Sequence, residues 1–163
     1  MLVIVEGPDG TGKTTLVKEL CEHYNYLKVN DITKDTPSQF RMWNILMEEC
    51  VKSYKKYVID RCFLSDWAYR LVKNDSFRSL DLYEISSLLN RPDVIYVFCN
   101  NDNAYTFAKN RGEYYIKSKE EHDKITNSYN FIKDTMLKFT NVKVIDYDFT
   151  KNNMQDLIDL LKV

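Results

Sequence analysis

Short runs of consecutive apolar residues alternate along this chain with longer segments whose apolar residues recur every three or four positions. The short runs predict buried strands near 2–6, 26–29, 57–60, 94–98 and 142–146. The longer segments predict helices near 13–24, 37–54, 63–73, 79–90, 103–111, 119–139 and 153–162. Alternation of this kind predicts an α/β fold in three layers, with about five parallel strands and helices on both faces of the sheet.

The bulk properties are those of a single globular domain spanning 1–163, without an internal repeat or a Pro/Ser-rich linker. A net charge of −1 makes a nucleic-acid partner unlikely. No apolar run is long enough for a membrane span, and no leader segment is expected. The cysteines are widely spaced and predict reduced, mostly buried thiols in the cytoplasm: Cys21, Cys50, Cys62 and Cys99.

The first apolar run leads into a segment that fits the phosphate-loop pattern G-x-x-x-x-G-K-[ST] at every fixed position, Gly7-Pro8-Asp9-Gly10-Thr11-Gly12-Lys13-Thr14. A helical pattern follows at once, which is the strand–loop–helix context that the motif needs. Glycines let backbone N–H groups surround phosphate oxygens at the positive end of the new helix. We therefore expect a nucleoside triphosphate to be bound by Gly7, Asp9, Gly10, Thr11, Gly12, Lys13, Thr14 and Thr15, with Lys13 reaching the β- and γ-phosphates and Thr14 binding Mg²⁺.

Asp60 and Arg61 follow the third predicted strand, so they should emerge beside the phosphate loop. A carboxylate there can bind Mg²⁺ together with Thr14, and the guanidinium of Arg61 can bind a phosphate through two hydrogen bonds. The alternative is structural: Asp60 caps the next helix, and Arg61 pairs with a surface acid.

The stretch 110–119 is polar and basic, contains Gly112 and lies between two predicted helices. It predicts a lid that closes over the site, with a solvated turn as the alternative.

Three sequences together resemble the thymidylate kinase family: the loop GPDGTGKTT, the segment DRCFLSDWAYR after the third strand, and Arg91-Pro92-Asp93 before the fourth. The resemblance extends to Arg111 and to Asn127-Ser128-Tyr129, and the short chain is similar to compact phage-type members. It implies a Mg²⁺-dependent transfer of phosphate from ATP to a deoxynucleoside monophosphate. It also implies a host-cytoplasmic location if phage-encoded, and a homodimer through the helices at 37–54 and 63–73.

The resemblance implies a role for each matching residue. Catalysis would depend on Lys13, Asp9, Arg61 and Arg111. Asp9 would contact the sugar 3′-hydroxyl, Arg61 the acceptor phosphate, and Arg111 the donor phosphates. The base pocket would be lined by Phe40, Arg41, Ser65, Tyr69 and Arg70. Phe40 could equally be a core residue, and Asp9 could instead hold the backbone of its own loop.

The chain departs from the family pattern in ways that leave the accepted base open. Cys62 stands where Tyr or His is usual, and Arg70 where a neutral polar residue reads the base. The stretch 30–37 lacks the arginine that usually also binds the acceptor phosphate, and Lys34 offers only a point charge there.

Three functions remain open from the sequence. The first is a deoxynucleoside monophosphate kinase, with thymidylate or a modified pyrimidine nucleotide favoured as the acceptor. The second is a kinase with the same machinery that acts on a nucleoside or on a base hydroxyl in DNA. The third is a nucleotide-gated switch, which would need partner-contacting loops around the γ-phosphate. His23 and His122 are expected to be surface or packing residues.

Overall fold

The computed structural model describes residues 1–29, 39–73, 89–91, 93–112 and 118–162, of which 39–42 are described by their backbone alone. Its sheet contains five parallel strands, β1 (Leu2–Glu6), β2 (Tyr26–Val29), β3 (Lys56–Asp60), β4 (Val94–Cys99) and β5 (Lys143–Tyr147). They lie in the order β2-β3-β1-β4-β5, so β1 is central, between β3 and β4.

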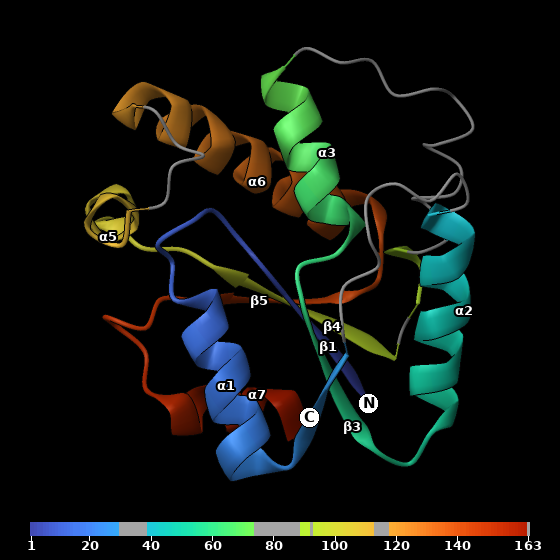
Figure 1. The fold of residues 1–163 in the computed structure, drawn as a ribbon. Helices are drawn as coiled ribbons and strands as arrows, with labels where there is room; N and C mark the ends of the chain where they lie inside the picture. Colours follow the sequence, from blue (N-terminus) through green and yellow to red (C-terminus); the bar gives the residue numbers. More distant parts are fainter. Residues whose placement is uncertain (30–38, 74–88, 92, 113–117, 163) are drawn as a thin grey trace.

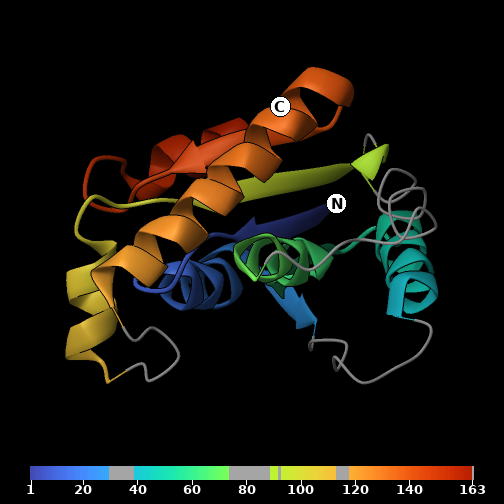
Figure 2. The ribbon, with the colours of Figure 1, turned by 90° about the horizontal axis from the view of Figure 1, so that it is seen from above.

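Helices cover both faces of this sheet (Figure 1). α1 (Lys13–Tyr24) and α7 (Met154–Lys162) pack on one face, against the side chains of Val3, Val5 and Val58. α2 (Gln39–Lys52), α3 (Phe63–Val72) and α6 (Lys119–Phe139) pack on the other. α5 (Ala104–Asn110) lies at the end of the sheet beside the loop that follows β1 (Figure 2).

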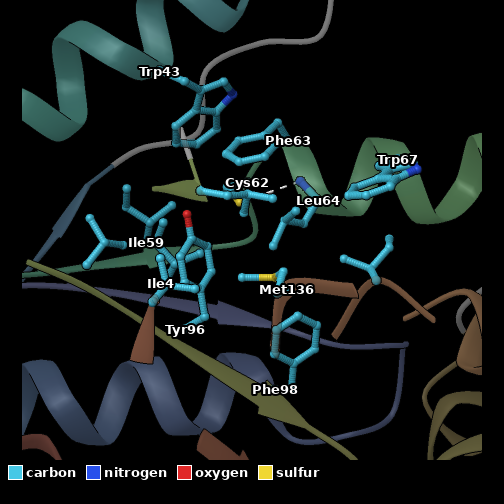
Figure 3. Packing of buried hydrophobic residues seen from close by; sticks show 14 of the residues in the cluster. Ile4, Trp43, Ile59, Cys62, Phe63, Leu64, Trp67, Tyr96, Phe98 and Met136 are labelled. Carbon is cyan, nitrogen blue, oxygen red and sulfur yellow. Dashed lines mark hydrogen bonds between the residues drawn. The ribbon is translucent and has the colours of Figure 1, made fainter. Parts of the chain in front are cut away.

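The core on the α2–α3–α6 side is rich in aromatic residues (Figure 3). Trp43 of α2 meets Phe63 of α3 edge to face, with ring centroids 6.4 Å apart. Tyr96 of β4 is buried below them. β1 and β4 are buried along their whole length, because helices cover both of their faces.

The predicted α/β class and the five parallel strands are confirmed, including the strand at 26–29. Six of the predicted helices are observed, with ends that differ from the expectation by no more than a residue or two. The helix predicted at 79–90 lies outside the described residues except at its end, and so does the middle of the lid predicted at 110–119, residues 113–117. The four cysteines form no disulfide with one another, and Cys50, Cys62 and Cys99 are buried.

Among the described residues, no helix is long and apolar enough to cross a membrane.

The strand order determines where a ligand site can form. The chain leaves β1 toward α1 on one face, whereas β3 leads into α3 on the other. Loops that diverge in this way open a crevice at the carboxyl ends of adjacent parallel strands. The loops after β1 and β3 therefore meet at the edge of the sheet formed by the carboxyl ends of the strands.

Candidate active site

The phosphate loop has a backbone that depends on glycine at two close approaches. Gly10 and Gly12 have φ of +80° and +82°, in the left-handed region that other residues rarely adopt. A Cβ on Gly10 would lie 1.9 Å from the carbonyl oxygen of Ala104, so the loop lies directly against α5. Gly12 is also the N-cap of α1, which leaves the first N–H groups of that helix facing the loop.

Lys13 begins α1, and its side chain is only 5% exposed. Its ammonium group donates a hydrogen bond to the carbonyl oxygen of Pro8 and lies 3.5 Å from the hydroxyl of Thr11. Burial, followed by the charge of nearby Arg61, lowers the pKa of Lys13 to about 8, although Asp9 opposes this shift. A buried lysine beside another cation favours an anion close by.

A pocket with a volume of about 160 Å³ opens in front of this loop. It is predominantly polar, and three cationic side chains reach it from separate parts of the chain. Its lining consists of Asp9, Gly10, Gly12, Lys13, Thr14, Asp60, Arg61 and Arg111. Lys13 comes from the phosphate loop, Arg61 from the end of β3, and Arg111 from the C-terminus of α5. Such a combination is suited to binding phosphate groups.

Arg61 adopts a strained backbone conformation, with φ of +71°. A residue other than glycine in this region costs roughly 1–3 kcal/mol, which the surrounding contacts must offset. Its backbone N–H donates to the carbonyl oxygen of Val5 at 2.9 Å, and its guanidinium forms an ion pair with Asp9. The same guanidinium donates to the hydroxyl of Tyr129 at 3.1 Å. The strained turn thus directs Arg61 back toward the phosphate loop.

Asp9 is held from three sides. One carboxylate oxygen accepts a hydrogen bond from Arg61, and the other accepts one from the hydroxyl of Tyr69 at 3.2 Å. Burial and the carboxylate of Asp9 raise the pKa of Tyr69 to about 12, so its hydroxyl stays protonated as a donor. The carbonyl oxygen of Asp9 accepts a hydrogen bond from Nε2 of His122 on α6 at 2.9 Å.

Glu6, the last residue of β1, is fully buried. Its carboxylate accepts hydrogen bonds from the backbone N–H of Cys62 at 2.6 Å and from the hydroxyl of Ser65 at 2.7 Å. Burial raises the pKa of Glu6, and these hydrogen bonds partly counteract that shift. Glu6 therefore joins the end of β1 to the start of α3.

The pocket also contains the oxygen groups that a hard divalent cation requires. Thr14 and Asp60 both line it, from α1 and from the end of β3. Lys28 of β2 lies 3.9 Å from the carboxylate of Asp60. A hydroxyl and a carboxylate of this kind fit Mg²⁺, which prefers a small number of protein oxygens together with water and phosphate.

The structure brings most of the predicted residues together. All of the predicted catalytic residues line the pocket, and so do Thr14 and Asp60. Ser65 and Tyr69 lie beside it, bound to Glu6 and Asp9. Arg70 forms an ion pair with Asp66 at 2.9 Å and is not among the lining residues. The side chains of Phe40 and Arg41 lie outside the described part of the chain. Thr15 is exposed on the first turn of α1.

Three residues of the site had no role assigned from the sequence. Glu6 had a detectable signal, because it is a charged residue at the end of an apolar run, immediately before Gly7. Tyr129 and His122 both lie on α6, far along the chain from the loop that they support. His122 is a buried packing residue, as one of the two expectations had it, and it also binds Asp9.

Comparison with known proteins finds similarity in structure alone. No protein-family model matches the sequence, and no curated protein matches it. The structure of the YorR protein from Bacillus subtilis, in complex with phosphorylated GDP, has a TM-score of 0.74 and 20% identity, covering 99% of this chain and 96% of that one. Deoxyadenosine kinase from M. mycoides with bound dATP has a TM-score of 0.63 and 16% identity, covering 99% and 97%. The structure of the same enzyme with bound dCTP has a TM-score of 0.56 and 19% identity, covering 99% of this chain and 97% of that one.

At such low identity the likeness concerns the fold. The chain has the P-loop kinase fold: a five-stranded parallel sheet with helices on both faces and a phosphate loop after the central strand.

Proposed function

We propose that this chain transfers the γ-phosphate of ATP to a deoxynucleoside monophosphate, with thymidylate or a similar pyrimidine nucleotide as the favoured acceptor. One observation carries the proposal: Arg61, held by Asp9, lines the same pocket as Lys13 and Arg111. The loop lysine is suited to the phosphates of the donor. A guanidinium opposite it, able to bind phosphate through two hydrogen bonds, suits a second substrate that also carries phosphate.

The phosphate loop supplies what a nucleoside triphosphate needs. The glycines leave room for phosphate oxygens, the N-terminus of α1 supplies N–H groups, and Lys13 supplies a positive charge. Thr14 and Asp60 would hold Mg²⁺, which when bound neutralises charge on the phosphate oxygens.

Phosphoryl transfer requires mainly that the reacting groups be positioned and their charge neutralised. Lys13 and Arg111 would stabilise the negative charge of the phosphoryl group in transit. Arg61 would bind the acceptor phosphate, and Asp9, together with Tyr69, would orient the acceptor. For the base of the acceptor we retain the proposed contacts of Phe40, Arg41 and Arg70, but not that of Ser65, whose hydroxyl is bound to Glu6.

A nucleoside kinase is the second candidate, and the similarity to deoxyadenosine kinase structures favours it. An uncharged acceptor hydroxyl needs a general base within reach. The pocket carboxylates of the described residues are Asp9 and Asp60. Both carboxylate oxygens of Asp9 already accept hydrogen bonds, from Arg61 and Tyr69, so Asp9 is not free to bind an acceptor hydroxyl, which favours the monophosphate acceptor.

An acceptor screen tests the proposal. The purified protein, ATP and Mg²⁺ are incubated with each common deoxynucleoside and nucleoside monophosphate, with nucleosides and with duplex DNA. ADP and the phosphorylated product are measured together. Lys13→Met protein, prepared identically, controls for contaminating kinases. Conversion of one or a few monophosphates is the expected result. Conversion of nucleosides or DNA alone would replace the proposal with the second candidate or its DNA variant, and ATP binding without any product would contradict transfer altogether.

A further inference from the structure

A chain of hydrogen bonds runs from Arg61 into the interior of the protein. Nη1 of Arg61 donates to the hydroxyl of Tyr129 at 3.1 Å. The hydroxyl oxygens of Tyr129 and Ser65 are 2.8 Å apart, and Ser65 donates to Glu6 at 2.7 Å. Its members come from the end of β3, from α6, from α3 and from β1, so the chain joins four elements at one point.

The direction of every hydrogen bond in this chain follows from its two ends. A guanidinium has donors only, so the hydroxyl of Tyr129 accepts from Arg61. Ser65 donates its single hydrogen to Glu6, so between the two hydroxyls Tyr129 is the donor and Ser65 the acceptor. The chain therefore ends on an acceptor, and an ionised Glu6 supplies one. Its second oxygen accepts from the N–H of Cys62 in the same way.

Two members of the chain are removed from water, whereas Arg61 and Ser65 are half-buried. Glu6 is 0% exposed and Tyr129 is 2% exposed. A buried polar group that loses its partner costs roughly 1–3 kcal/mol, so breaking one link would leave groups on both sides unsatisfied. The arrangement is therefore held as a unit.

Arg61 is consequently held at both ends of its guanidinium. Asp9 binds Nη2, and Nη1 makes its shortest hydrogen bond with Tyr129, at 3.1 Å, and longer ones of 3.4 Å with the carbonyl oxygen of Gly7 and the hydroxyl of Ser65. A planar group held at one end can still rotate, whereas one held at both ends has a defined plane. In the hydrogen bonds of the described residues, Nε of Arg61 is not used as a donor, which leaves the Nε edge of the held plane for a ligand.

We propose that Glu6, Ser65 and Tyr129 are positioning residues, and that they hold the guanidinium plane of Arg61 in the orientation that receives the phosphate of the acceptor. This inference deepens the proposed function and rests on it for the identity of the ligand. None of the three residues needs to touch either substrate.

Two tyrosine substitutions form the test. Tyr129→Phe removes the hydroxyl that accepts from Arg61 and keeps the packing of the ring. Tyr96→Phe is the matched control: Tyr96 is fully buried in the same core, and its hydroxyl has no hydrogen-bond partner in the structure described (Figure 3). Ser65→Ala breaks the chain at its middle hydroxyl and serves if Tyr129→Phe does not fold.

The first readout does not depend on activity. NMR of arginine side chains distinguishes a held guanidinium, which gives separate Nη proton signals, from a rotating one, which gives averaged signals; Arg61→Lys identifies the signals of Arg61. We expect separate signals in the wild type and in Tyr96→Phe, and averaged signals in Tyr129→Phe. Unchanged signals in Tyr129→Phe would overturn the positioning role.

The second readout is steady-state kinetics with ATP and the acceptor varied in turn. Tyr129→Phe should raise the KM for the acceptor, or lower its kcat/KM, by about tenfold, while the KM for ATP changes less than about twofold. Equal effects on both substrates, or an effect no larger than that of Tyr96→Phe, would show a general structural role and overturn the inference. If the wild type phosphorylates no acceptor, the proposed function fails, and the NMR result alone decides whether the chain holds Arg61.

Discussion

Nε2 of His122 lies 2.9 Å from the carbonyl oxygen of Asp9, so helix α6 is joined directly to the phosphate loop. A carbonyl oxygen can only accept, and Nε2 must therefore carry a proton. His122 also meets Tyr105 of α5 edge to face, with ring centroids 5.8 Å apart. One buried histidine thus connects the loop with both helices that flank the segment 111–118.

Replacement of His122 tests this link. His122→Phe should destabilise the protein by about 1–2 kcal/mol and raise the KM for ATP, because the carbonyl oxygen of Asp9 loses its donor. The amide of His122→Gln can donate in the same place, so this variant should retain most of the stability and most of the affinity for ATP. The measurement is urea unfolding together with steady-state kinetics, and the exposed His23→Gln is the control. A Gln variant as impaired as the Phe variant would show that the ring matters for its packing and not for its hydrogen bond.

Burial of Lys13 predicts a dependence of stability on pH. Its pKa is lowered to about 8 in the folded protein, whereas in the unfolded chain it lies near 10.5. Between these values the unfolded state binds more protons, so this lysine makes the folded state more stable as pH rises through that window. Below pH 8 the cost of the buried charge is present in full, and it amounts to about 3 kcal/mol.

Lys13→Met removes that charge and keeps the apolar part of the side chain. We expect Lys13→Met to be more stable than the wild type near pH 7, by up to about 3 kcal/mol, with the difference shrinking as pH approaches roughly 10.5. Urea unfolding of both proteins at several pH values measures it, with the exposed Lys162→Met as the control. A difference that does not vary with pH would contradict the lowered pKa.

The two pocket arginines should be needed for turnover and not for folding. Arg61→Ala and Arg111→Ala should each lower kcat/KM by on the order of 10³-fold. Arg61→Ala removes the cation proposed to bind the acceptor phosphate, and Arg111→Ala removes one proposed to stabilise the phosphoryl group in transit. Arg91→Ala removes a guanidinium that lies outside the pocket, bound to Asn44, and should keep most activity. Unfolding curves establish that each variant is folded. Near-normal activity of either pocket variant would remove its assigned role.

Substitution of two glycines with similar φ angles allows the cost of backbone strain to be distinguished from that of steric conflict. Gly10 and Gly112 have φ of +80° and +70°, but a Cβ on Gly112 would meet nothing within 4 Å. Gly112→Ala should therefore cost only about 1 kcal/mol of stability. Gly10→Ala must also displace α5, and should cost about 2–4 kcal/mol. Thermal or urea unfolding compares them, and equal losses would mean that the loop does not press against Ala104.

The proposed metal site makes a separate prediction. Asp60→Asn keeps the shape of the side chain and removes its charge, so the Mg²⁺ concentration for half-maximal activity should rise about tenfold or more. Asp159→Asn, an exposed substitution on α7, is the control. Mg²⁺ titrations at saturating ATP measure the half-maximal concentration for both variants. An unchanged midpoint in Asp60→Asn would place the metal on other groups.

The sequence by itself determined the fold class and the phosphate loop. Both are carried by local patterns: apolar runs that predict strands, and glycine, lysine and threonine at fixed offsets between a strand and a helix. Asp60 and Arg61 were also predictable, because residues at the carboxyl ends of neighbouring parallel strands meet at one edge of the sheet. Local patterns of this kind reflect backbone geometry, which neighbouring residues impose on one another.

Only the tertiary structure decided what holds these groups in place. Tyr129 reaches Arg61 across 68 positions of the chain, and His122 reaches Asp9 across 113. In the sequence, Tyr129 and His122 are ordinary positions of an amphipathic helix. Their partners are brought to them only by the packing of α6 against α3 and the sheet. The same is true of Glu6: its charge is visible in the sequence, but its hydrogen-bond partners are brought to it only where β1 meets the start of α3.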